Sequence, residues 1–309
     1  MQKSLRFMFA GQGAQVVGMG RDLAETSDAA ARLFEQADTI LGRSISTLCF
    51  EGPAEQLTES RNCQPAIYTV SLACLAALRE RTAVTPTVCG GLSLGEFAAL
   101  TAAGALRFED GLKLVARRGE AMQEACRARD GAMAAVINAD FDTVAHTAET
   151  HGIDLANLNC PGQIVISGRR SDVEAAVDNL RENGVRTIVM LDVDGAFHSR
   201  LMAPAADRFA EALAETDLSE PQCPVVQNVV GADVQDPDRI RKNLAAQVTG
   251  TVRWEDCVRT MIEKGVDTLV ECGPGAVLGK FMRRIDRRMP TLNVENTETL
   301  EAAAAELES

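Results

Sequence analysis

The sequence predicts an α/β fold with a mainly parallel sheet and a smaller unit inserted into it. Apolar runs alternate with helical patterns in the first and last thirds of the chain. Strands that read as continuous apolar runs are typical of a parallel sheet covered on both faces. A serine flanked by glycines stands between such a strand and a helix. In the middle third of the chain, the order of strands and helices is different. With 309 residues the chain can bury a sizeable core.

The first third opens with a buried strand, expected over residues 5–10, that runs into the tight loop Gly11-Gln12-Gly13-Ala14-Gln15. The elements expected after this loop are, in order, helices over 29–40 and 65–78, a strand over 85–90, a helix starting near Glu96, and a long helix over 108–125.

The middle third contains shorter strands, two of them joined by a turn at Asn159-Cys160-Pro161-Gly162. Its expected elements are a strand over 132–137, a helix over 141–150, strands over 153–158 and 163–167, a helix over 172–182 and a strand over 185–191. The order β-α-β-β-α-β is that of a ferredoxin-like unit. We therefore expect a ferredoxin-like subdomain at 130–192.

The last third returns to the larger domain, which would consist of residues 1–129 and 193–309. Its expected elements are a helix over 201–214, strands over 224–230 and 266–271, and helices over 240–246 and 255–263.

Composition excludes several classes of protein. The net charge of -13, with one Trp and one Tyr, argues against nucleic acid as the main partner. No apolar stretch approaches membrane-spanning length, and residues 1–4 lead into a strand rather than a signal-peptide core. The nine scattered cysteines form no C-x-x-C pair, which is typical of reduced, mostly buried thiols. We expect a cytoplasmic protein.

The segment Gly91-Leu92-Ser93-Leu94-Gly95 follows the apolar run ending at Gly90 and precedes a helix. This is the G-x-S-x-G nucleophile elbow, in which flanking glycines permit a strained turn that exposes the serine hydroxyl. The helix start offers backbone N–H groups to a developing oxyanion. The alternative interpretation is that this segment is a Gly/Ser-rich turn with no catalytic role.

A serine nucleophile needs a base, and the chain has three histidines. His146 and His151 fall on or just beyond a helix of the inserted unit, which favours surface or capping roles. His198 lies in an irregular segment between the two units, where catalytic groups concentrate, so it is the preferred base. Asp192, Asp194 or a backbone carbonyl could orient its ring, and the residues alone leave this open.

With Ser93 and His198 placed, the chain resembles the malonyl-CoA:acyl carrier protein transacylase family, shared with acyltransferase domains of fatty-acid and polyketide synthases. The resemblance covers nearly the whole chain. It rests on Phe9 to Gln15, Gln64-Pro65-Ala66, Gly91 to Glu96, Arg118 to Gln123, Gly131 to Val136, Asn159 to Gln163, Gly195 to Met202 and Glu271 to Gly275.

The resemblance implies a large α/β-hydrolase-like catalytic domain and a role for each matching residue. Ser93 would be the acylated nucleophile and His198 the general base, oriented by the main-chain carbonyl of Gln247. Backbone N–H groups of Gln12 and Leu94 would form the oxyanion hole, and Arg118 would hold the malonyl carboxylate. The residues expected at the acyl pocket are Phe197, Leu92, Gln64 and Asn159.

Three of these residues carry an argument of their own. Only a guanidinium offers a rigid two-pronged match to a free carboxylate, which suits Arg118, whereas Arg117 is expected to be a solvated helix residue. Phe197, just before the histidine, resembles malonyl-selective members, because a phenyl ring leaves little room for an extra methyl. Leu92 departs from the histidine that most members have before the serine, so no base at that position is required.

A basic cluster near the C-terminus is the candidate docking surface for an acidic acyl carrier protein. Its members are Lys280, Arg283, Arg284, Arg287 and Arg288. On one helix, Lys280, Arg284 and Arg288 would form a row and Arg283 and Arg287 a second, with Phe281 and Ile285 facing inward. The alternative is an ordinary solvated helix face.

The predicted reaction is ping-pong transfer of malonyl from malonyl-CoA to the phosphopantetheine thiol of the carrier through a malonyl-serine, with no metal or cofactor, by a monomer. A serine acyl hydrolase or thioesterase would pass the same acyl group to water. A trans-acting polyketide-synthase acyltransferase would use another acyl-CoA, and a carrier-binding scaffold would lack turnover. The chemistry is the same in fatty-acid and polyketide synthesis, so the sequence is consistent with both pathways.

Overall fold

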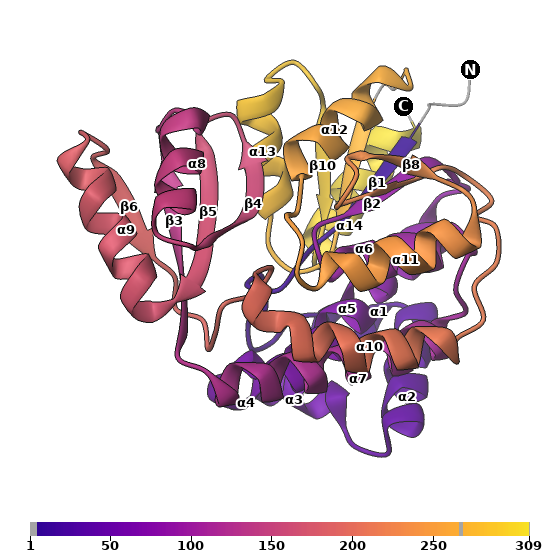
Figure 1. The fold of residues 1–309 in the computed structure, drawn as a ribbon. Coiled ribbons are helices and arrows are strands. Elements are labelled where there is room, and N and C mark those ends of the chain that lie inside the picture. Colours follow the sequence, from indigo (N-terminus) through magenta and orange to yellow (C-terminus); the bar gives the residue numbers. More distant parts are fainter. Residues whose placement is uncertain (1–4, 266–267, 309) are drawn as a thin grey trace.

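The chain forms two separate β-sheets, seen in a computed structural model that describes residues 5–265 and 268–308 (Figure 1). The larger sheet is mainly parallel and is covered by helices on both faces. The smaller sheet is antiparallel and carries two helices on one face. The predicted mixed α/β fold with a mainly parallel sheet is confirmed.

The large sheet has the strand order β10-β9-β1-β2-β7-β8. All neighbours are parallel except β7 and β8, which pair antiparallel at one edge. Its strands are β1 (Leu5–Phe9), β2 (Pro86–Gly91), β7 (Val225–Gln227), β8 (Ala232–Val234), β9 (Thr268–Cys272) and β10 (Thr291–Val294). The first two residues of the strand expected over 266–271 lie outside the described residues, and β9 begins at Thr268.

Helices cover both faces of this sheet, as alternate residues of β1 show. Phe7 and Phe9 pack into the larger core with α2, α5 and α7, whereas Met8 packs on the other face with α12 and α13. The helices of this part are α1 (Arg21–Thr26), α2 (Asp28–Leu41), α3 (Ile45–Glu51), α4 (Ala54–Thr58), α5 (Ser60–Arg81), α6 (Gly95–Ala102), α7 (Phe108–Ala128), α10 (Ala203–Ala214), α11 (Pro237–Gln247), α12 (Trp254–Glu263), α13 (Val277–Ile285) and α14 (Thr297–Glu308).

Helix α5 begins earlier than the sequence predicts. It runs through Pro65, although proline lacks the N–H that would bond the carbonyl of Arg61. That carbonyl instead accepts a hydrogen bond from Arg43 Nη2 at 2.9 Å, which keeps the turn satisfied. The helix is buried along most of its length. Across the described residues, no helix is both long and apolar enough to cross a membrane.

The small sheet has the order β4-β5-β3-β6. Its strands are β3 (Gly131–Ile137), β4 (Asp154–Cys160), β5 (Gln163–Arg169) and β6 (Thr187–Met190), and its helices are α8 (Phe141–Thr150) and α9 (Arg170–Glu182). Both helices bury their apolar sides against one face of the sheet. Met133, Ala135 and Val165 face the other way and join the large core. The two sheets therefore share packing rather than being linked only by the chain.

Backbone hydrogen bonds also tie the small sheet to the rest of the molecule. The Val252 amide donates to the Ala156 carbonyl at 2.8 Å, and the Leu158 amide donates to the Val252 carbonyl at 2.9 Å. Val252 follows the end of α11, and Ala156 and Leu158 lie on β4. The segment that follows α11 is thereby fixed against β4.

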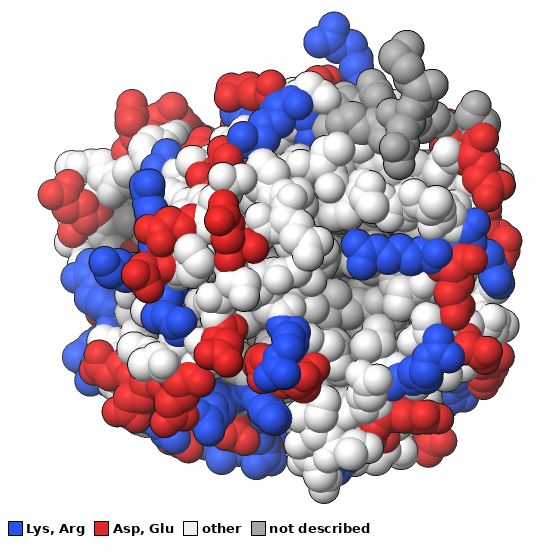
Figure 2. All heavy atoms as spheres, turned by 90° about the vertical axis from the view of Figure 1, so that its right-hand side faces the viewer, with Lys and Arg blue, Asp and Glu red and all other residues white. Residues whose placement is uncertain are grey.

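The surface carries mixed charge on the side where α11 and β8 lie in Figure 1. Figure 2 shows acidic and basic side chains interspersed around an uncharged centre on this face. All nine cysteines are free of disulfides, and all but Cys223 are buried, as the prediction of mostly buried thiols requires.

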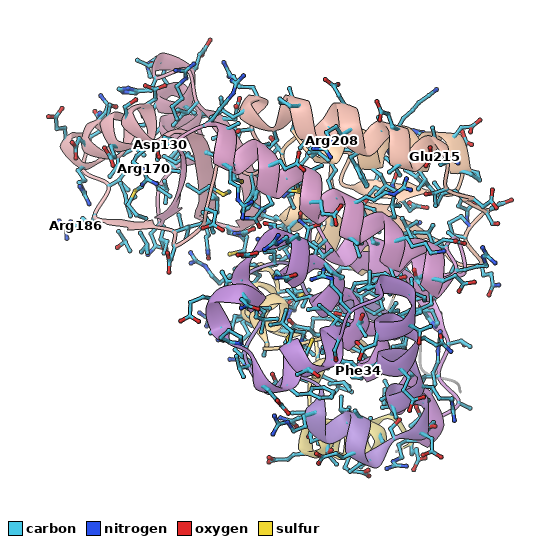
Figure 3. All side chains as sticks on the ribbon, turned by 90° about the horizontal axis from the view of Figure 1, so that it is seen from below. Phe34, Asp130, Arg170, Arg186, Arg208 and Glu215 are labelled. Carbon is cyan, nitrogen blue, oxygen red and sulfur yellow. The ribbon has the colours of Figure 1, made fainter. Side chains whose placement is uncertain are left out.

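Helices α7 and α10 lie side by side, as Figure 3 shows from below. Exposed ion pairs join them, Arg208 with Glu124 and Arg117 with Glu215, but such pairs contribute little to stability. Burial of Phe209 and Leu213 on α10 supplies the larger contribution. This packing anchors one end of residues 191–202, the segment that connects β6 to α10 and carries His198.

Candidate active site

The predicted strand, turn and helix around Ser93 are present. Strand β2 ends at Gly91, and α6 begins at Gly95. Ser93 has a φ of 52°, in the left-handed region that a nucleophile elbow requires and that side chains disfavour. A Cβ at Gly91 would lie 2.0 Å from the carbonyl carbon of Gly95, and one at Gly95 would lie 2.1 Å from the Phe9 oxygen. Both flanking glycines are therefore required by close packing.

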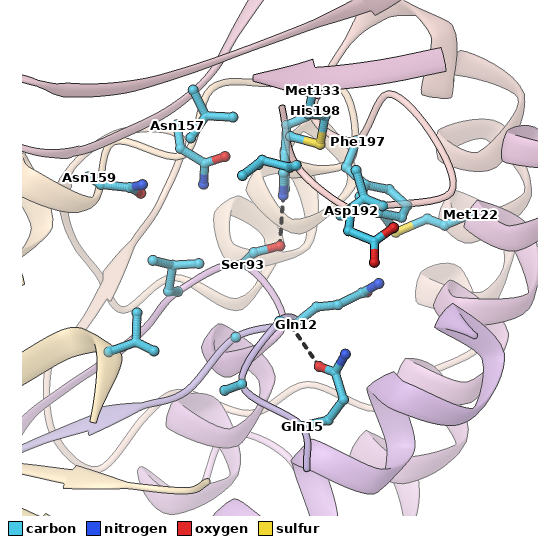
Figure 4. Close-up of a pocket in the computed structure, with 18 of the residues that line it drawn as sticks. Gln12, Gln15, Ser93, Met122, Met133, Asn157, Asn159, Asp192, Phe197 and His198 are labelled. Atoms are coloured by element: carbon cyan, nitrogen blue, oxygen red, sulfur yellow. Dashed lines mark hydrogen bonds between the residues drawn. The ribbon is translucent and has the colours of Figure 1, made fainter. Parts of the chain in front are cut away.

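His198 reaches the serine from the segment between β6 and α10. Its Nε2 lies 2.8 Å from Ser93 Oγ (Figure 4). Its Nδ1 lies 2.8 Å from the main-chain oxygen of Gln247. Of the three candidates for orienting the ring, the backbone carbonyl is the one that contacts it, whereas Asp192 and Asp194 are exposed and line the cavity. His146 is exposed, and His151 caps the end of α8.

Arg118 projects from α7 to the same serine. Its Nη2 donates to Ser93 Oγ at 3.1 Å and to Gln247 Oε1 at 3.0 Å, while its Nη1 donates to Gln64 Oε1 at 2.8 Å. The guanidinium is buried and lies 5.6 Å from the ring centroid of Phe97. Arg117, one residue earlier, is exposed as expected.

Burial sets the protonation state of these groups. It lowers the pKa of His198 to about 4, and the nearby Arg118 charge lowers it further, whereas the Gln247 carbonyl acts in the opposite direction. The imidazole is therefore neutral near pH 7 and can accept a proton. Burial lowers the pKa of Arg118 to about 10, partly offset by Glu96, so its guanidinium remains charged.

A cavity of about 250 Å³ opens over Ser93, His198 and Arg118. Much of its wall is apolar, with polar side chains at Gln12, Gln15, Asn157 and Asn159. The apolar side chains that line it are Ala14, Leu92, Met122, Met133, Val165, Leu191, Val193, Phe197, Val277, Leu278 and Phe281. An acyl chain with one charged end matches this combination of an apolar wall and a buried cation.

Comparison with known proteins assigns this chain to a family. Residues 6–301 match the model of the acyl transferase domain. The chain belongs to the acyl transferase family. Over 304 residues it is 43% identical to the malonyl CoA-acyl carrier protein transacylase of Bacillus subtilis (strain 168), covering 97% of this chain and 96% of that one. The resemblance predicted from the motifs is confirmed.

Solved structures of the family share the fold. The acyl-carrier-protein-S-malonyltransferase of Bartonella henselae has a TM-score of 0.94 at 38% identity, covering 99% of this chain and 100% of that one. A malonyl-transacylase solved in complex with a type II PKS acyl-carrier protein has a TM-score of 0.95 at 34% identity, covering 98% and 99%.

The pocket residues expected from the family pattern are not all in the pocket. Leu92, Phe197 and Asn159 line the cavity, but Gln64 does not. Gln64 is fully buried behind Arg118, and its Nε2 lies 3.3 Å from Gln12 Oε1. Its amide oxygen is taken by Arg118, so this residue supports the arginine rather than facing an acyl group.

The loop of residues 11–15 lies against the elbow. A Cβ at Gly11 would lie 2.6 Å from the Leu92 oxygen, so only glycine permits this approach. Gly13 N donates to Gln15 Oε1 at 2.8 Å, which closes the loop (Figure 4). Within the described part of the chain, the backbone N–H groups of Gln12 and Leu94 have no acceptor. Both amides are thus free to serve an oxyanion.

The basic cluster differs from the two helical rows that the sequence predicts. Helix α13 ends at Ile285, where Asp286 takes an extended backbone and its carboxylate accepts from the Arg288 amide at 2.9 Å. Arg287 and Arg288 therefore lie beyond the helix. All five basic residues are exposed, and Arg284 donates to Asn138 Oδ1 at 2.8 Å. Phe281 and Ile285 face inward as predicted.

Sequence reasoning missed the polar residues beneath the serine. Asn228, just after β7, accepts a hydrogen bond from the Ser93 amide at 2.6 Å. Glu96 lies on α6 one helical turn after the serine and is buried. The sequence feature that could have identified Glu96 is a charged residue directly before the apolar run Phe97 to Leu100. Asn228 gives no such signal, because its role depends on a distant strand meeting the elbow.

Proposed function

We propose that this chain transfers a malonyl group from malonyl-CoA to the phosphopantetheine thiol of an acyl carrier protein, through a malonyl ester of Ser93. The observation that carries the proposal is the buried Arg118 guanidinium, 3.1 Å from Ser93 Oγ. A malonyl thioester attacked by this oxygen has a free carboxylate close by, and a charged guanidinium is its natural partner.

The first half-reaction forms the ester. His198 Nε2 takes the proton of Ser93 as Oγ attacks the thioester carbonyl, and the backbone N–H groups of Gln12 and Leu94 hold the oxyanion. When the tetrahedral intermediate collapses, the C–S bond breaks and the CoA thiolate takes the proton from His198. The Gln247 carbonyl keeps the imidazole oriented throughout.

The second half-reaction reverses these roles. His198 takes the proton of the phosphopantetheine thiol, whose sulfur attacks the ester carbonyl. Collapse breaks the C–O bond and returns the proton to Ser93 Oγ, leaving malonyl on the carrier. This sequence requires no metal or redox cofactor.

Intact-mass measurement tests the first half-reaction. Incubation with malonyl-CoA alone should add one malonyl group to the wild type and none to Ser93→Ala. Adding a phosphopantetheinylated carrier should then yield malonyl-carrier. Release of free malonate would instead support an acyl hydrolase or thioesterase, and acylation only by another acyl-CoA would support the trans-acting polyketide alternative.

The carrier is proposed to dock beside α13, where Lys280, Arg283 and Arg284 are exposed next to the cavity residue Phe281. Arg287 and Arg288 extend this basic surface past the helix end. The structural relative solved with its acyl-carrier protein supports a carrier as partner. We propose that the protein acts as a monomer in the cytoplasm, in fatty-acid or polyketide synthesis.

We also propose a finer division of the fold into two units. We assign residues 1–129 and 193–309 to an α/β-hydrolase-like catalytic domain, which the nucleophile elbow after β2 supports. We assign residues 130–192 to a ferredoxin-like subdomain. The element order β3-α8-β4-β5-α9-β6 and the sheet order β4-β5-β3-β6 support that assignment.

A further inference from the structure

Glu96 is a buried carboxylate beneath the nucleophile that the proposed reaction does not use. It lies on α6, three residues after Ser93, and is 1% exposed. The residues that follow it on the helix, Phe97 to Leu100, are buried and apolar. Burying a carboxylate is costly unless hydrogen bonds compensate, so its partners indicate what it does.

All the hydrogen-bond partners of the Glu96 carboxylate are donors. Oε2 accepts from the Asn228 amide at 2.8 Å and from Gln247 Nε2 at 2.9 Å, and Oε1 accepts from Gln227 Nε2 at 3.0 Å. An ionised carboxylate only accepts, so it satisfies all three, whereas the amide of a glutamine would turn an NH₂ group toward a donor. The site is therefore shaped for the ionised carboxylate.

The orientation of both glutamine amides is fixed from the other side. Gln247 Oε1 accepts from Arg118 Nη2 at 3.0 Å, and Gln227 Oε1 accepts from Asn243 Nδ2 at 2.7 Å. Each amide must then present its nitrogen to Glu96. The carboxylate thus completes a network in which every amide has one possible orientation.

Two partners of Glu96 hold the backbone of Ser93 on both sides. Asn228 Oδ1 accepts from the Ser93 N–H at 2.6 Å, and Gln247 Nε2 donates to the Ser93 carbonyl at 3.1 Å. Asn228 also donates to the Gly91 carbonyl at 2.8 Å. A serine at a φ of 52° persists only where its surroundings enforce that conformation.

We propose that Glu96 is a positioning residue whose ionised carboxylate, acting through Asn228 and Gln247, holds the strained backbone of Ser93 and so aims its hydroxyl at His198. This inference rests on the proposed role of Ser93 as the acylated nucleophile. It assigns to Glu96 an effect on the serine itself, independent of which acyl group is transferred.

The charge of Glu96 gives the network a pH dependence. Burial raises the pKa of this carboxyl to about 7, while its hydrogen bonds and the charge of Arg118 act in the opposite direction. The titratable groups that face it are Arg118 from α7 and the Cys257 thiol from α12, whose pKa burial raises well above its ordinary value. The carboxylate therefore forms as the pH rises through about 7, and the network is complete above that pH.

The test compares Glu96→Gln with the wild type in the acylation half-reaction. Malonyl-CoA and acetyl-CoA are used separately at about pH 8, and phenylmethanesulfonyl fluoride labels the serine without any CoA. We expect kcat to fall by about tenfold or more, by the same factor for both donors, with KM nearly unchanged and labelling slowed in parallel. A structural defect in the malonyl site alone would instead change the malonyl-to-acetyl ratio.

Glu271→Gln is the matched control. Glu271 is also buried, accepts from the Leu278 and Gly279 amides, and has a pKa raised to about 7 by burial. In the wild type and in Glu271→Gln, kcat should decrease as the pH falls through about 7, toward the kcat of Glu96→Gln. The kcat of Glu96→Gln should not show this decrease. If Glu96→Gln does not fold, the presence or absence of the kcat decrease near pH 7 in the other two proteins still tests the role of Glu96.

The outcomes that would contradict the role of Glu96 can be distinguished from those that would contradict the proposed function. Unchanged kcat and labelling in folded Glu96→Gln, or a wild-type profile flat through pH 7, would overturn the role of Glu96 while leaving the proposed function intact. No acylation of the wild type by malonyl-CoA would overturn both.

Discussion

Arg118 Nη2 lies 3.1 Å from Ser93 Oγ, so the group that we propose for the malonyl carboxylate also contacts the nucleophile. The same nitrogen donates to Gln247 Oε1, and the other terminal nitrogen donates to Gln64. Since the guanidinium is buried, a carboxylate reaching it meets a cation that water does not screen. We propose that this position and charge make Arg118 select a dicarboxylic acyl group.

Replacing Arg118 with Lys should lower kcat/KM for malonyl-CoA by about 10- to 100-fold, more than charge counting suggests. An ammonium cannot replace the planar contacts to Gln64, Gln247 and a carboxylate at once. Acylation by acetyl-CoA, which lacks the carboxylate, should change much less. Rapid-quench acylation with both donors measures this, and equal malonyl turnover in the variant would contradict the assignment.

Replacing Phe197 with Ser should raise the methylmalonyl-to-malonyl ratio of kcat/KM by about tenfold, because one methyl group is worth about 1–3 kcal/mol in such a pocket. Phe197 lines the cavity directly before His198, so removing its ring opens space beside the reacting carbonyl. Competition between the two acyl-CoA donors, read by intact mass, gives the ratio.

Phe281→Ser is the positional control for that change. Phe281 lines the same cavity from α13. An equal shift in this variant would show that volume anywhere in the cavity suffices, which would contradict a specific role for Phe197.

Reversing charge at Arg284 and Arg287 should raise KM for the acyl carrier protein and leave KM for malonyl-CoA unchanged. Both side chains are exposed, and an acidic carrier approaching this surface would meet two carboxylates instead of two cations. The difference should shrink at high salt, since exposed charges are screened. Charge reversal at the exposed Arg181 and Arg186 makes the same change in net charge and serves as the control. An identical effect there would point to net charge rather than docking.

The sequence predicts the proximity of Ser93 and His198 better than it predicts the residues that support them. The elbow is readable because Gly91 and Gly95 are required within one local turn. His198 can be recognised because only three histidines compete, and the other two lie on or just beyond one helix. Both inferences use local sequence patterns. In the structure, Ser93 Oγ and His198 Nε2 lie 2.8 Å apart.

The remaining features depend on contacts between distant segments. Asn228 and Gln247 become partners of Ser93 only when β7 and α11 pack beside α6, and no local pattern marks them. Gln64 was expected to line the pocket, but it is buried behind Arg118, and its amide oxygen accepts a hydrogen bond from that guanidinium. The helix through Pro65 depends on Arg43 reaching the Arg61 carbonyl, and the end of α13 depends on the Asp286 side chain.

The final prediction concerns stability as a function of pH. Folding lowers the pKa of His198 to about 4 from an ordinary value of 6.5, because the buried imidazole resists protonation. Between these values the unfolded chain binds more protons, so the contribution of His198 to stability is complete above 6.5 and is lost as the pH falls to about 4. The full difference corresponds to about 3 kcal/mol.

Urea unfolding of wild type and His198→Gln at several pH values isolates this contribution. The wild type should lose stability relative to the variant as the pH falls from 6.5 to about 4, and the difference should stay constant above 6.5. Glu96 and Glu271 have raised pKa values and act with the opposite sign, but they are common to both proteins and cancel in the comparison. A difference independent of pH would mean that His198 is not held neutral by its burial.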